Sequence, residues 1–74
     1  MYKIYLDIEG MMCSMCEAHI NNEIRKAAKV KKVKSSHKKN EAIIVMDNKD
    51  NIESIINSIK AIGYGCSLNR IEEI

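Results

Sequence analysis

Apolar and polar residues alternate at the start of the chain, over residues 2–9. Tyr2, Ile4, Leu6 and Ile8 are separated by single residues that are mostly charged. Because successive side chains of a strand point to opposite faces, this pattern predicts a strand with one buried face. Gly10 interrupts the alternation and is expected to end the strand.

A helical pattern follows, with apolar residues three or four positions apart at Ile20, Ile24 and Ala27. Ser14, followed three residues later by Glu17, has the form of a capping box. This signature predicts a helix that begins near residue 15. Acidic residues lie toward the start of the segment and basic residues toward its end, which is the order that the helix dipole favours.

The next two segments indicate strands. Residues 30–35 contain two valines among lysines, a pattern typical of an exposed or edge strand. Residues 37–40 are rich in lysine and predict a turn. Residues 42–46 form an uninterrupted apolar run, which predicts a central strand.

A second amphipathic helix is predicted near the end of the chain. Asp50 with Glu53 forms another capping box, and Gly63 is expected to end the helix in the C′ position. Residues 66–71 predict a last strand. The apolar stripe of the helix consists of five isoleucines, Ile52, Ile55, Ile56, Ile59 and Ile62.

The predicted order is strand, helix, strand, strand, helix, strand, and the 74 residues suffice for one small domain. Helices segregated to one face of an antiparallel sheet define the α+β class. For this order of elements the sequence predicts the ferredoxin-like βαββαβ sandwich, with two helices on one face of the sheet.

Two cysteines lie between the first predicted strand and the first predicted helix, in the run GMMCSMC at residues 10–16. A helix N-terminus lowers the pKa of a thiol, which favours the thiolate that a metal ligand must be. Soft sulfur ligands select Cu(I), Zn(II) and iron–sulfur iron over magnesium or calcium. A closed structural zinc site needs four ligands. Because the chain has no second CxxC and no HxxxH, Cys13 and Cys16 predict an open metal site.

Composition narrows the class of function. The chain has 12 basic and 10 acidic residues, a net charge of +2, and its three tyrosines are its only aromatic residues. This balance, without an RNP-type pattern, argues against nucleic-acid binding. Eight of the basic residues fall within residues 25–39, with no acidic residue among them. We interpret this run as a solvated face that could steer an acidic partner.

The N-terminus has no apolar run long enough for a signal peptide, and no segment approaches membrane length. The sequence therefore predicts a cytoplasmic protein that is not inserted in a membrane. Thiols stay reduced in that compartment, so the CxxC pair indicates metal or redox chemistry. The odd number of cysteines, three, also argues against a disulfide framework.

The run GMMCSMC resembles the GMxCxxC motif of heavy-metal-associated domains, and AIGY at residues 61–64 is similar to the stretch that ends the second helix of that family. The family includes copper chaperones and the N-terminal metal-binding modules of P-type metal ATPases. The resemblance covers essentially the whole chain, so residues 1–74 are expected to form a single heavy-metal-associated domain.

The resemblance implies roles for four residues. Cys13 and Cys16 would be the thiolate ligands of Cu(I), and Met11 would pack under the loop as part of the core. Tyr64 would sit beside the metal and shield it. The chain departs from the family pattern at Glu17, where a small or apolar residue is common, and at residues 28–29, which replace the usual Pro-Gly.

Met12 bears on the choice of metal. The family often has threonine at this position, and its Zn(II) and Cd(II) modules often have aspartate, which adds a hard carboxylate ligand. A thioether cannot play that part, so two thiolates alone favour Cu(I), and Ag(I) should bind likewise. Zn(II), Cd(II) and Hg(II) are alternatives, and a role in mercury traffic stays open.

Cys66 lies two residues beyond Tyr64, so on a strand the two side chains share a face. We favour a place in the core for Cys66, with a third metal ligand as the alternative. For Met12 and Met15 we favour docking or loop packing over coordination by their thioethers. His19 and His37 are interpreted as exposed side chains, in the first helix and in the lysine-rich turn.

Together, these observations predict a cytosolic Cu(I)-binding metallochaperone and not an enzyme. It would hand copper to a P-type metal ATPase, or to its metal-binding domain, by thiolate ligand exchange. The alternatives are a module of such an ATPase and a carrier of another soft metal, and a metal-bridged dimer is left open. A thiol redox module is a remote alternative, because the chain has no proline and thioredoxins place a cis-proline opposite their cysteines.

Overall fold

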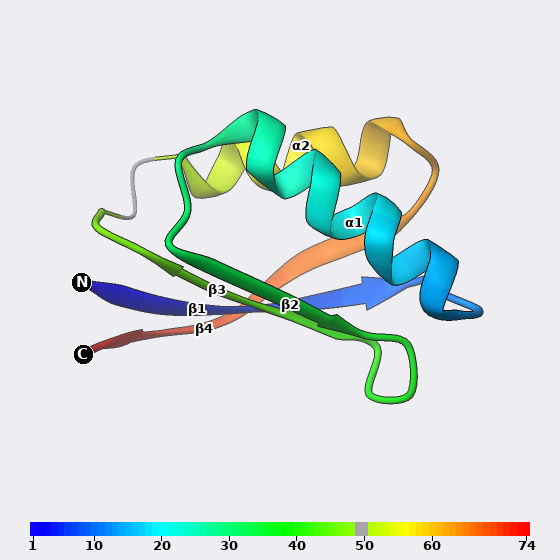
Figure 1. Cartoon of the computed structure of the whole chain (residues 1–74), viewed down its shortest axis with the longest axis horizontal. Helices are drawn as coiled ribbons and strands as arrows, with labels where there is room; N and C mark the ends of the chain where they lie inside the picture. Colours follow the sequence, from blue (N-terminus) through cyan, green and yellow to red (C-terminus); the bar gives the residue numbers. More distant parts are fainter. Residues whose placement is uncertain (49–50) are drawn as a thin grey trace.

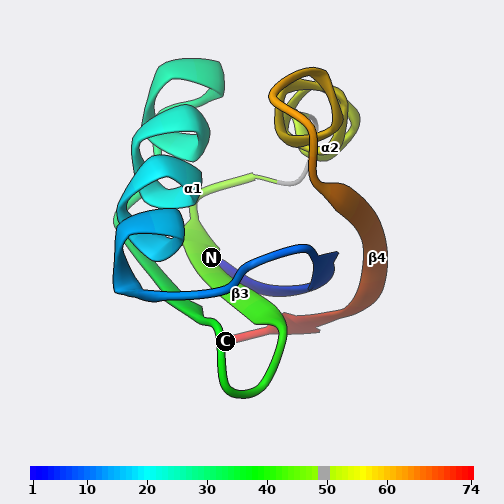
Figure 2. The same ribbon diagram turned by 90° about the vertical axis from the view of Figure 1, so that its right-hand side faces the viewer.

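The structure, a computed structural model, describes residues 1–48 and 51–74. Its four strands form one antiparallel sheet in the order β2-β3-β1-β4, and both helices cover the same side of that sheet (Figure 2). The predicted α+β, ferredoxin-like βαββαβ sandwich is confirmed. The elements are β1 (Tyr2–Glu9), α1 (Ser14–Ala27), β2 (Lys32–Ser36), β3 (Glu41–Met46), α2 (Ile52–Ala61) and β4 (Gly65–Glu73) (Figure 1).

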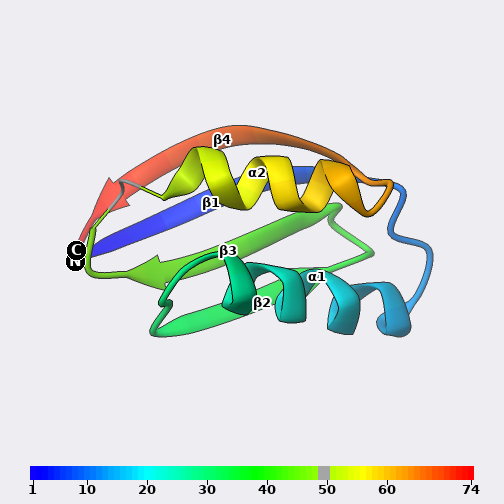
Figure 3. The ribbon, with the colours of Figure 1, turned by 90° about the horizontal axis from the view of Figure 1, so that it is seen from above.

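The core lies between the sheet and the two helices. Alternate side chains of β1 point into it, and Ile4, Leu6 and Ile8 are completely buried. β3 pairs with β1 over its whole length and is flanked by β2 on its other side, as expected of a central strand. Seen from above, α1 lies over β2 and β3, and α2 lies over β1 and β4 (Figure 3).

β2 is an edge strand, as its lysines indicate, but it covers residues 32–36 instead of residues 30–35. Val30 remains in the preceding loop, where it packs against the core. The next residue, Lys31, donates its backbone N–H to the carbonyl of Val45 at 2.7 Å. This contact holds the loop beside the end of β3 before regular pairing begins.

The start of α1 differs from the predicted capping box. Ser14 is the first helical residue, and Cys13 occupies the N-cap position without a side-chain hydrogen bond. The carbonyl of Cys13 accepts hydrogen bonds from the backbone N–H groups of Cys16 and Glu17, at 3.1 and 3.4 Å. The capping box of Ser14 and Glu17 is therefore wrong, and the Glu17 carboxylate binds a different partner, described below.

The end of α2 follows the prediction. Gly63 has a φ of +100°, and its N–H donates to the carbonyl of Lys60, while the N–H of Tyr64 donates to the carbonyl of Ile59. These two bonds form a Schellman motif, in which glycine takes the left-handed conformation. Ile62, the last isoleucine of the predicted stripe, is the C-cap just outside the helix and is 41% exposed. The second predicted capping box involves Asp50, which lies outside the described residues.

One end of the sandwich gathers four segments. The end of β1, the start of α1, the turn between β2 and β3 and the loop after α2 lie there (Figure 1). Ile8 donates its N–H to the carbonyl of Asn40, which ties the turn to the end of β1 at 2.8 Å. The two chain termini lie at the opposite end (Figure 1), where Ile74 donates its N–H to the carbonyl of Met1 at 2.9 Å.

Candidate metal centre

The two cysteines of the CxxC motif lie where the loop after β1 passes into α1. Cys13 is exposed and Cys16 is half-buried in the first turn of the helix. Met11 is buried in the core beneath the loop, whereas the side chain of Met12 is 82% exposed and that of Met15 is 67% exposed. The loop is therefore anchored from below by one methionine, and the exposed thiol of Cys13 lies between two exposed methionines in the sequence.

Tyr64 packs across the beginning of this loop. Gly10 has a φ of +101°, and a Cβ atom placed there would lie 3.3 Å from Cδ1 of Tyr64. The hydroxyl of Tyr64 hydrogen-bonds to Cys16. The Schellman turn of α2 thus delivers an aromatic ring to the cysteine loop, and the glycine at position 10 leaves space for it.

The environment of Cys16 favours its thiolate. The backbone N–H of Met12 and the hydroxyl of Tyr64 both donate hydrogen bonds to the sulfur of Cys16. These bonds, of which the one from Met12 has the larger effect, lower the pKa of Cys16 to about 7. The same hydrogen bond, with burial as a second cause, raises the pKa of Tyr64. Near neutral pH the loop therefore holds a sulfur nucleophile that is substantially ionised before any metal arrives.

Cys66 lies in the core at the start of β4 and is 7% exposed. Burial raises the pKa of its thiol to about 11, and the charged groups that act on it are Lys60 and Asp7. Within the part of the chain that the structure describes, no three histidine, cysteine or acidic side chains converge as metal ligands. Cys66 is therefore not brought together with Cys13 and Cys16.

The interaction between Glu17 and His37 was not predicted. The Glu17 carboxylate accepts hydrogen bonds from the backbone N–H of His37 at 2.8 Å and from its ring Nδ1 at 2.6 Å. The expected solvated state of His37 is wrong, because antiparallel pairing of β3 with β1 returns the β2–β3 turn to the end of the molecule that carries the cysteines. In the sequence, the signal that could have pointed to this interaction was the acidic residue at position 17, where the family commonly has a small or apolar one.

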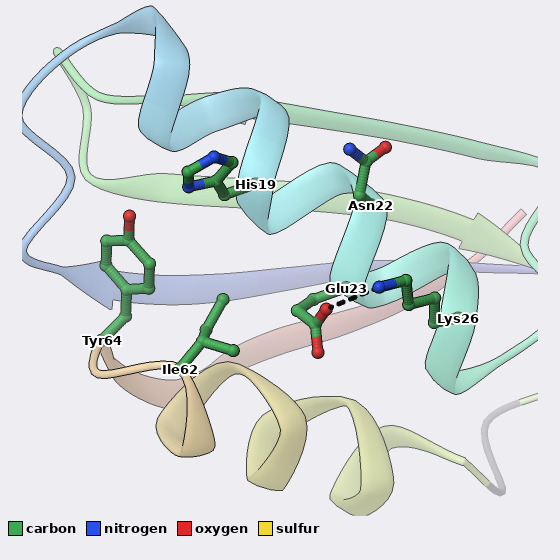
Figure 4. A pocket seen from close by; sticks show the side chains of 6 residues that line it. All are labelled: His19, Asn22, Glu23, Lys26, Ile62 and Tyr64. Atoms are coloured by element: carbon green, nitrogen blue, oxygen red, sulfur yellow. Dashed lines mark ion pairs between the residues drawn. The ribbon is translucent and has the colours of Figure 1, made fainter.

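A hollow of about 240 Å³ opens between α1 and α2 next to the loop. In Figure 4 the Tyr64 ring stands at one end of it and faces the exposed His19 of α1, and an ion pair between Lys26 and Glu23 lies at the other end. The remaining lining side chains are Asn22 and Ile62. The hollow is thus connected to the thiols through Tyr64, which lines it and contacts Cys16.

Among the described residues, no helix is long and apolar enough to cross a membrane.

This fold, with a thiol pair on a loop at one end, defines a small domain for soft metals. The family model of the heavy-metal-associated domain matches residues 6–65, and the chain belongs to that family.

Two comparisons at the level of sequence concern much longer proteins. The chain is 31% identical over all of its 74 residues to a mercuric reductase of Lysinibacillus sphaericus, and it covers 13% of that protein. It is 34% identical over 61 residues to a mercuric reductase of Shewanella putrefaciens, with 82% of the chain and 11% of the relative covered. The chain thus spans about an eighth of the curated relatives that it matches.

Solved structures agree on the fold. The yeast copper transporter domain CCC2A, studied in apo and Cu(I)-loaded states, superimposes with a TM-score of 0.84 at 31% identity, covering 95% of this chain and 97% of that one. A copper-binding domain from HMA7, a P-type ATPase, gives a TM-score of 0.85 at 25% identity, covering 99% and 100%.

Proposed function

We propose that this domain binds Cu(I) through the thiolates of Cys13 and Cys16 and passes the ion to a partner by ligand exchange. The observation that carries the proposal is the site itself, an exposed thiol and a half-buried thiol three positions apart, with no third histidine, cysteine or acidic side chain converging on them among the described residues. Cu(I) accepts two sulfur ligands, whereas structural Zn(II) sites take four. The copper-binding neighbours in the comparison structures support the same metal.

Exchange needs an accessible leaving ligand. Cys13 is exposed on the outer side of the loop, and Cys16 is held by Met12 and Tyr64. A partner thiolate would add to the ion to give a three-coordinate intermediate, after which Cys13 leaves and a second partner thiolate displaces Cys16. No bond other than metal–sulfur bonds changes, and the metal stays Cu(I) throughout.

The proposed partner is a P-type metal ATPase or its metal-binding domain. Three features near the thiols suit a partner: the exposed side chains of Met12 and Met15, which are neighbours of the cysteines in the sequence, and the hollow that Tyr64 lines. Soft, flexible methionines suit such a contact surface. We place this exchange in the cytoplasm, where thiols stay reduced.

The test is the stoichiometry and competition of Cu(I) under reducing, anaerobic conditions. The wild type should bind one ion per chain, and Cys13→Ser and Cys16→Ser should each lose tight binding, because one thiolate cannot hold the ion against competing thiols. Cys66→Ala is the matched control and should bind like the wild type. Full affinity in both single serine variants would refute the assignment of the ligands.

Hg(II) is the second candidate metal. It is favoured by one observation, that the two curated relatives described above are mercuric reductases. A pair of thiolates is a suitable ligand set for Hg(II) and also for Cu(I), because both are soft metal ions. Transfer of each loaded metal to a purified copper-ATPase domain and to a mercuric reductase would separate the two, since the native metal should move to its own acceptor fast and completely.

A further inference from the structure

The turn between β2 and β3, residues 37–40, contacts both ends of the segment that carries the cysteines. Before the cysteines, the backbone N–H of Ile8 donates to the carbonyl of Asn40 at 2.8 Å, which extends the pairing of β1 with β3 by one bond. After them, the carboxylate of Glu17 accepts two hydrogen bonds from His37. The cysteine loop and the first turn of α1 are thus held between two anchor points on one short turn.

The turn has restraints of its own. Asn40 has a φ of 54°, in the left-handed region that asparagine adopts more readily than most residues. The backbone N–H of Lys39 donates to the hydroxyl of Ser36 at 3.4 Å, across the turn. Because the turn is tied to β1 through Asn40 and is also restrained internally, it presents His37 to α1 from a defined position.

The contact between Glu17 and His37 is the first of two polar contacts by which α1 binds β2 and its turn. One carboxylate oxygen of Glu17, Oε2, accepts both bonds, at 2.8 Å from the backbone N–H and at 2.6 Å from the ring Nδ1. Four residues further along the helix, Asn21 accepts a bond from the hydroxyl of the buried Ser35 at 2.6 Å. Hydrogen bonds to an ionised group are roughly twice as strong as those between neutral groups. The stronger of the two contacts is therefore the one next to Cys16.

The place of Cys16 depends on the orientation of this helical turn. Its sulfur accepts hydrogen bonds from the backbone N–H of Met12 and from the hydroxyl of Tyr64. Its own backbone N–H, like that of Glu17, donates to the carbonyl of Cys13. A rotation of the first turn of α1 would carry the sulfur away from the Tyr64 hydroxyl, which belongs to a different segment. Cys13, by contrast, is exposed and precedes the helix without a side-chain capping bond.

We propose that His37 is a positioning residue for the metal site. Through Glu17 it holds the first turn of α1 so that Cys16 stays in contact with Tyr64, and Cys16 therefore remains the bound ligand while Cys13 exchanges. His37 acts through the carboxylate and not as a ligand. This role rests on the proposed function, because the order of exchange has a meaning only if both cysteines bind the metal.

Three variants of the reduced, metal-free chain test this role by NMR. The signal is the NOE between the Tyr64 ring and the β protons of Cys16, which reports their contact in the absence of a metal. His37→Ala removes the ring bond and leaves the backbone N–H, so it should weaken the NOE. Glu17→Ala removes both bonds and should weaken it further. His37→Asn should restore it, because the side-chain amide of asparagine can donate from the position of Nδ1.

Ser35→Ala is the matched control. It removes the polar contact one helical turn further along α1, at Asn21. The variant should be less stable than the wild type in urea denaturation, because a buried hydrogen bond is lost. Its NOE between Tyr64 and Cys16 should nevertheless equal that of the wild type. This control separates a positioning role of His37 from a general loosening of α1 on β2.

The same variants, loaded with Cu(I), are then mixed with an excess of chelator in a stopped-flow experiment. His37→Ala should lose the metal about threefold faster than the wild type or more, because a bond to a charged group is lost beside the site. Glu17→Ala should be faster still. Adding His37→Ala to Glu17→Ala should have no further effect, because the ring acts only through the carboxylate. His37→Asn and Ser35→Ala should behave like the wild type.

Three results would overturn this role of His37. One is a wild type without the NOE, or a His37→Ala variant whose NOE and rate of copper loss equal those of the wild type. Another is a failure of His37→Asn to restore them, or a further effect of His37→Ala when Glu17→Ala is already present. The third is an equal loss of the contact in Ser35→Ala. A wild type that does not bind Cu(I) would refute the proposed function instead, and the NOE of the metal-free variants would still decide whether His37 positions Cys16.

Discussion

The Glu17 carboxylate and His37 join the first turn of α1 to the β2–β3 turn through two hydrogen bonds, at 2.8 and 2.6 Å. The contact spans 20 positions of the sequence, and both side chains are more than two-thirds buried. It fixes the helical turn that carries Cys16 against a second segment of the chain. The position of the half-buried thiol thus depends on a residue outside the CxxC motif.

This pair gives stability a pH dependence. The two hydrogen bonds from His37 lower the pKa of Glu17 below its ordinary value of 4.5, and the bond from the backbone N–H has the larger effect. The stabilisation is present above that ordinary value and is lost as the pH falls through the lowered one. Glu17→Gln should therefore lose less stability than the wild type between neutral pH and about pH 3, as measured by urea denaturation.

Glu53→Gln is the control for that measurement, because Glu53 occupies the first turn of α2 without such a partner among the described residues. Its stability should change with pH in parallel with the wild type. Equal acid sensitivity of Glu17→Gln and the wild type would show that the pair contributes nothing in solution.

Removing the Tyr64 hydroxyl should raise the pKa of Cys16 above its value of about 7, because one donor to the thiolate is lost while the Met12 N–H remains. Tyr64→Phe in metal-free protein is the variant, and the ultraviolet absorbance of the thiolate as a function of pH is the measurement. An unchanged titration would mean that the hydroxyl does not bind the sulfur in solution.

Removing the whole ring tests a different role of Tyr64. The ring packs over Gly10, and we expect it to limit the access of water and competing thiols to the site. Tyr64→Ala should lose Cu(I) to a competing chelator faster than Tyr64→Phe, with both cysteines still serving as ligands. Identical stopped-flow rates in the two variants would argue that Tyr64 only covers the end of the core.

Cys66 should behave as a core residue. Cys66→Ala is expected to cost about 1 kcal/mol of unfolding free energy or somewhat more, with copper affinity unchanged. Because burial raises the pKa of Cys66 to about 11, native protein near pH 7.5 should be alkylated at Cys13 and Cys16 well before Cys66. Mass spectrometry of partially alkylated protein measures this order. A loss of affinity without a loss of stability would make Cys66 a ligand.

The absence of a carboxylate at Met12 should make the domain bind Zn(II) more weakly than Cu(I). Met12→Asp places a hard carboxylate next to Cys13 and should strengthen Zn(II) binding relative to Cu(I) in competition titrations. Met15→Asp is a matched control, because Met15 is also exposed but lies within the helix. A wild type that already prefers Zn(II) would contradict the assignment of a copper site.

Substitution of Gly10 by alanine should be harmful for two reasons, backbone strain and a contact with Tyr64. The same substitution at Gly63 tests the first reason alone. Both glycines have a φ near +100°, where alanine costs about 1–2 kcal/mol. Only a Cβ at Gly10 meets the Tyr64 ring, whereas nothing lies within 4 Å of one at Gly63. Gly10→Ala should therefore lose both stability and copper retention, and Gly63→Ala should lose stability alone, as thermal unfolding and chelator competition would show.

The repeating patterns of the sequence were sufficient to predict the fold. Alternation in residues 2–9 and the isoleucine stripe of α2 are local signals, and both elements form where these signals lie. The first capping box failed because its signature does not reveal competition from a distant group, here His37, which lies 20 positions from Glu17 in the sequence and is brought next to it by the pairing of the strands. Cys13 and Cys16 stood out through their spacing. The place of Tyr64 near them was expected only from the family resemblance, because the contact depends on the Schellman turn and on the approach of β4 to β1.

The hydrogen bond between Ile74 and Met1 has a practical consequence for engineering. The first and last residues are neighbours, so a short peptide could join them and the chain could be reopened elsewhere as a circular permutant. The same proximity suits the domain for insertion into a surface loop of an unrelated protein. The two ends of the host loop would need to be separated by little more than the width of two strands. In a circular permutant or an inserted domain, Cys13 and Cys16 would lie at the end of the domain opposite to the joined termini and would remain available to a metal ion.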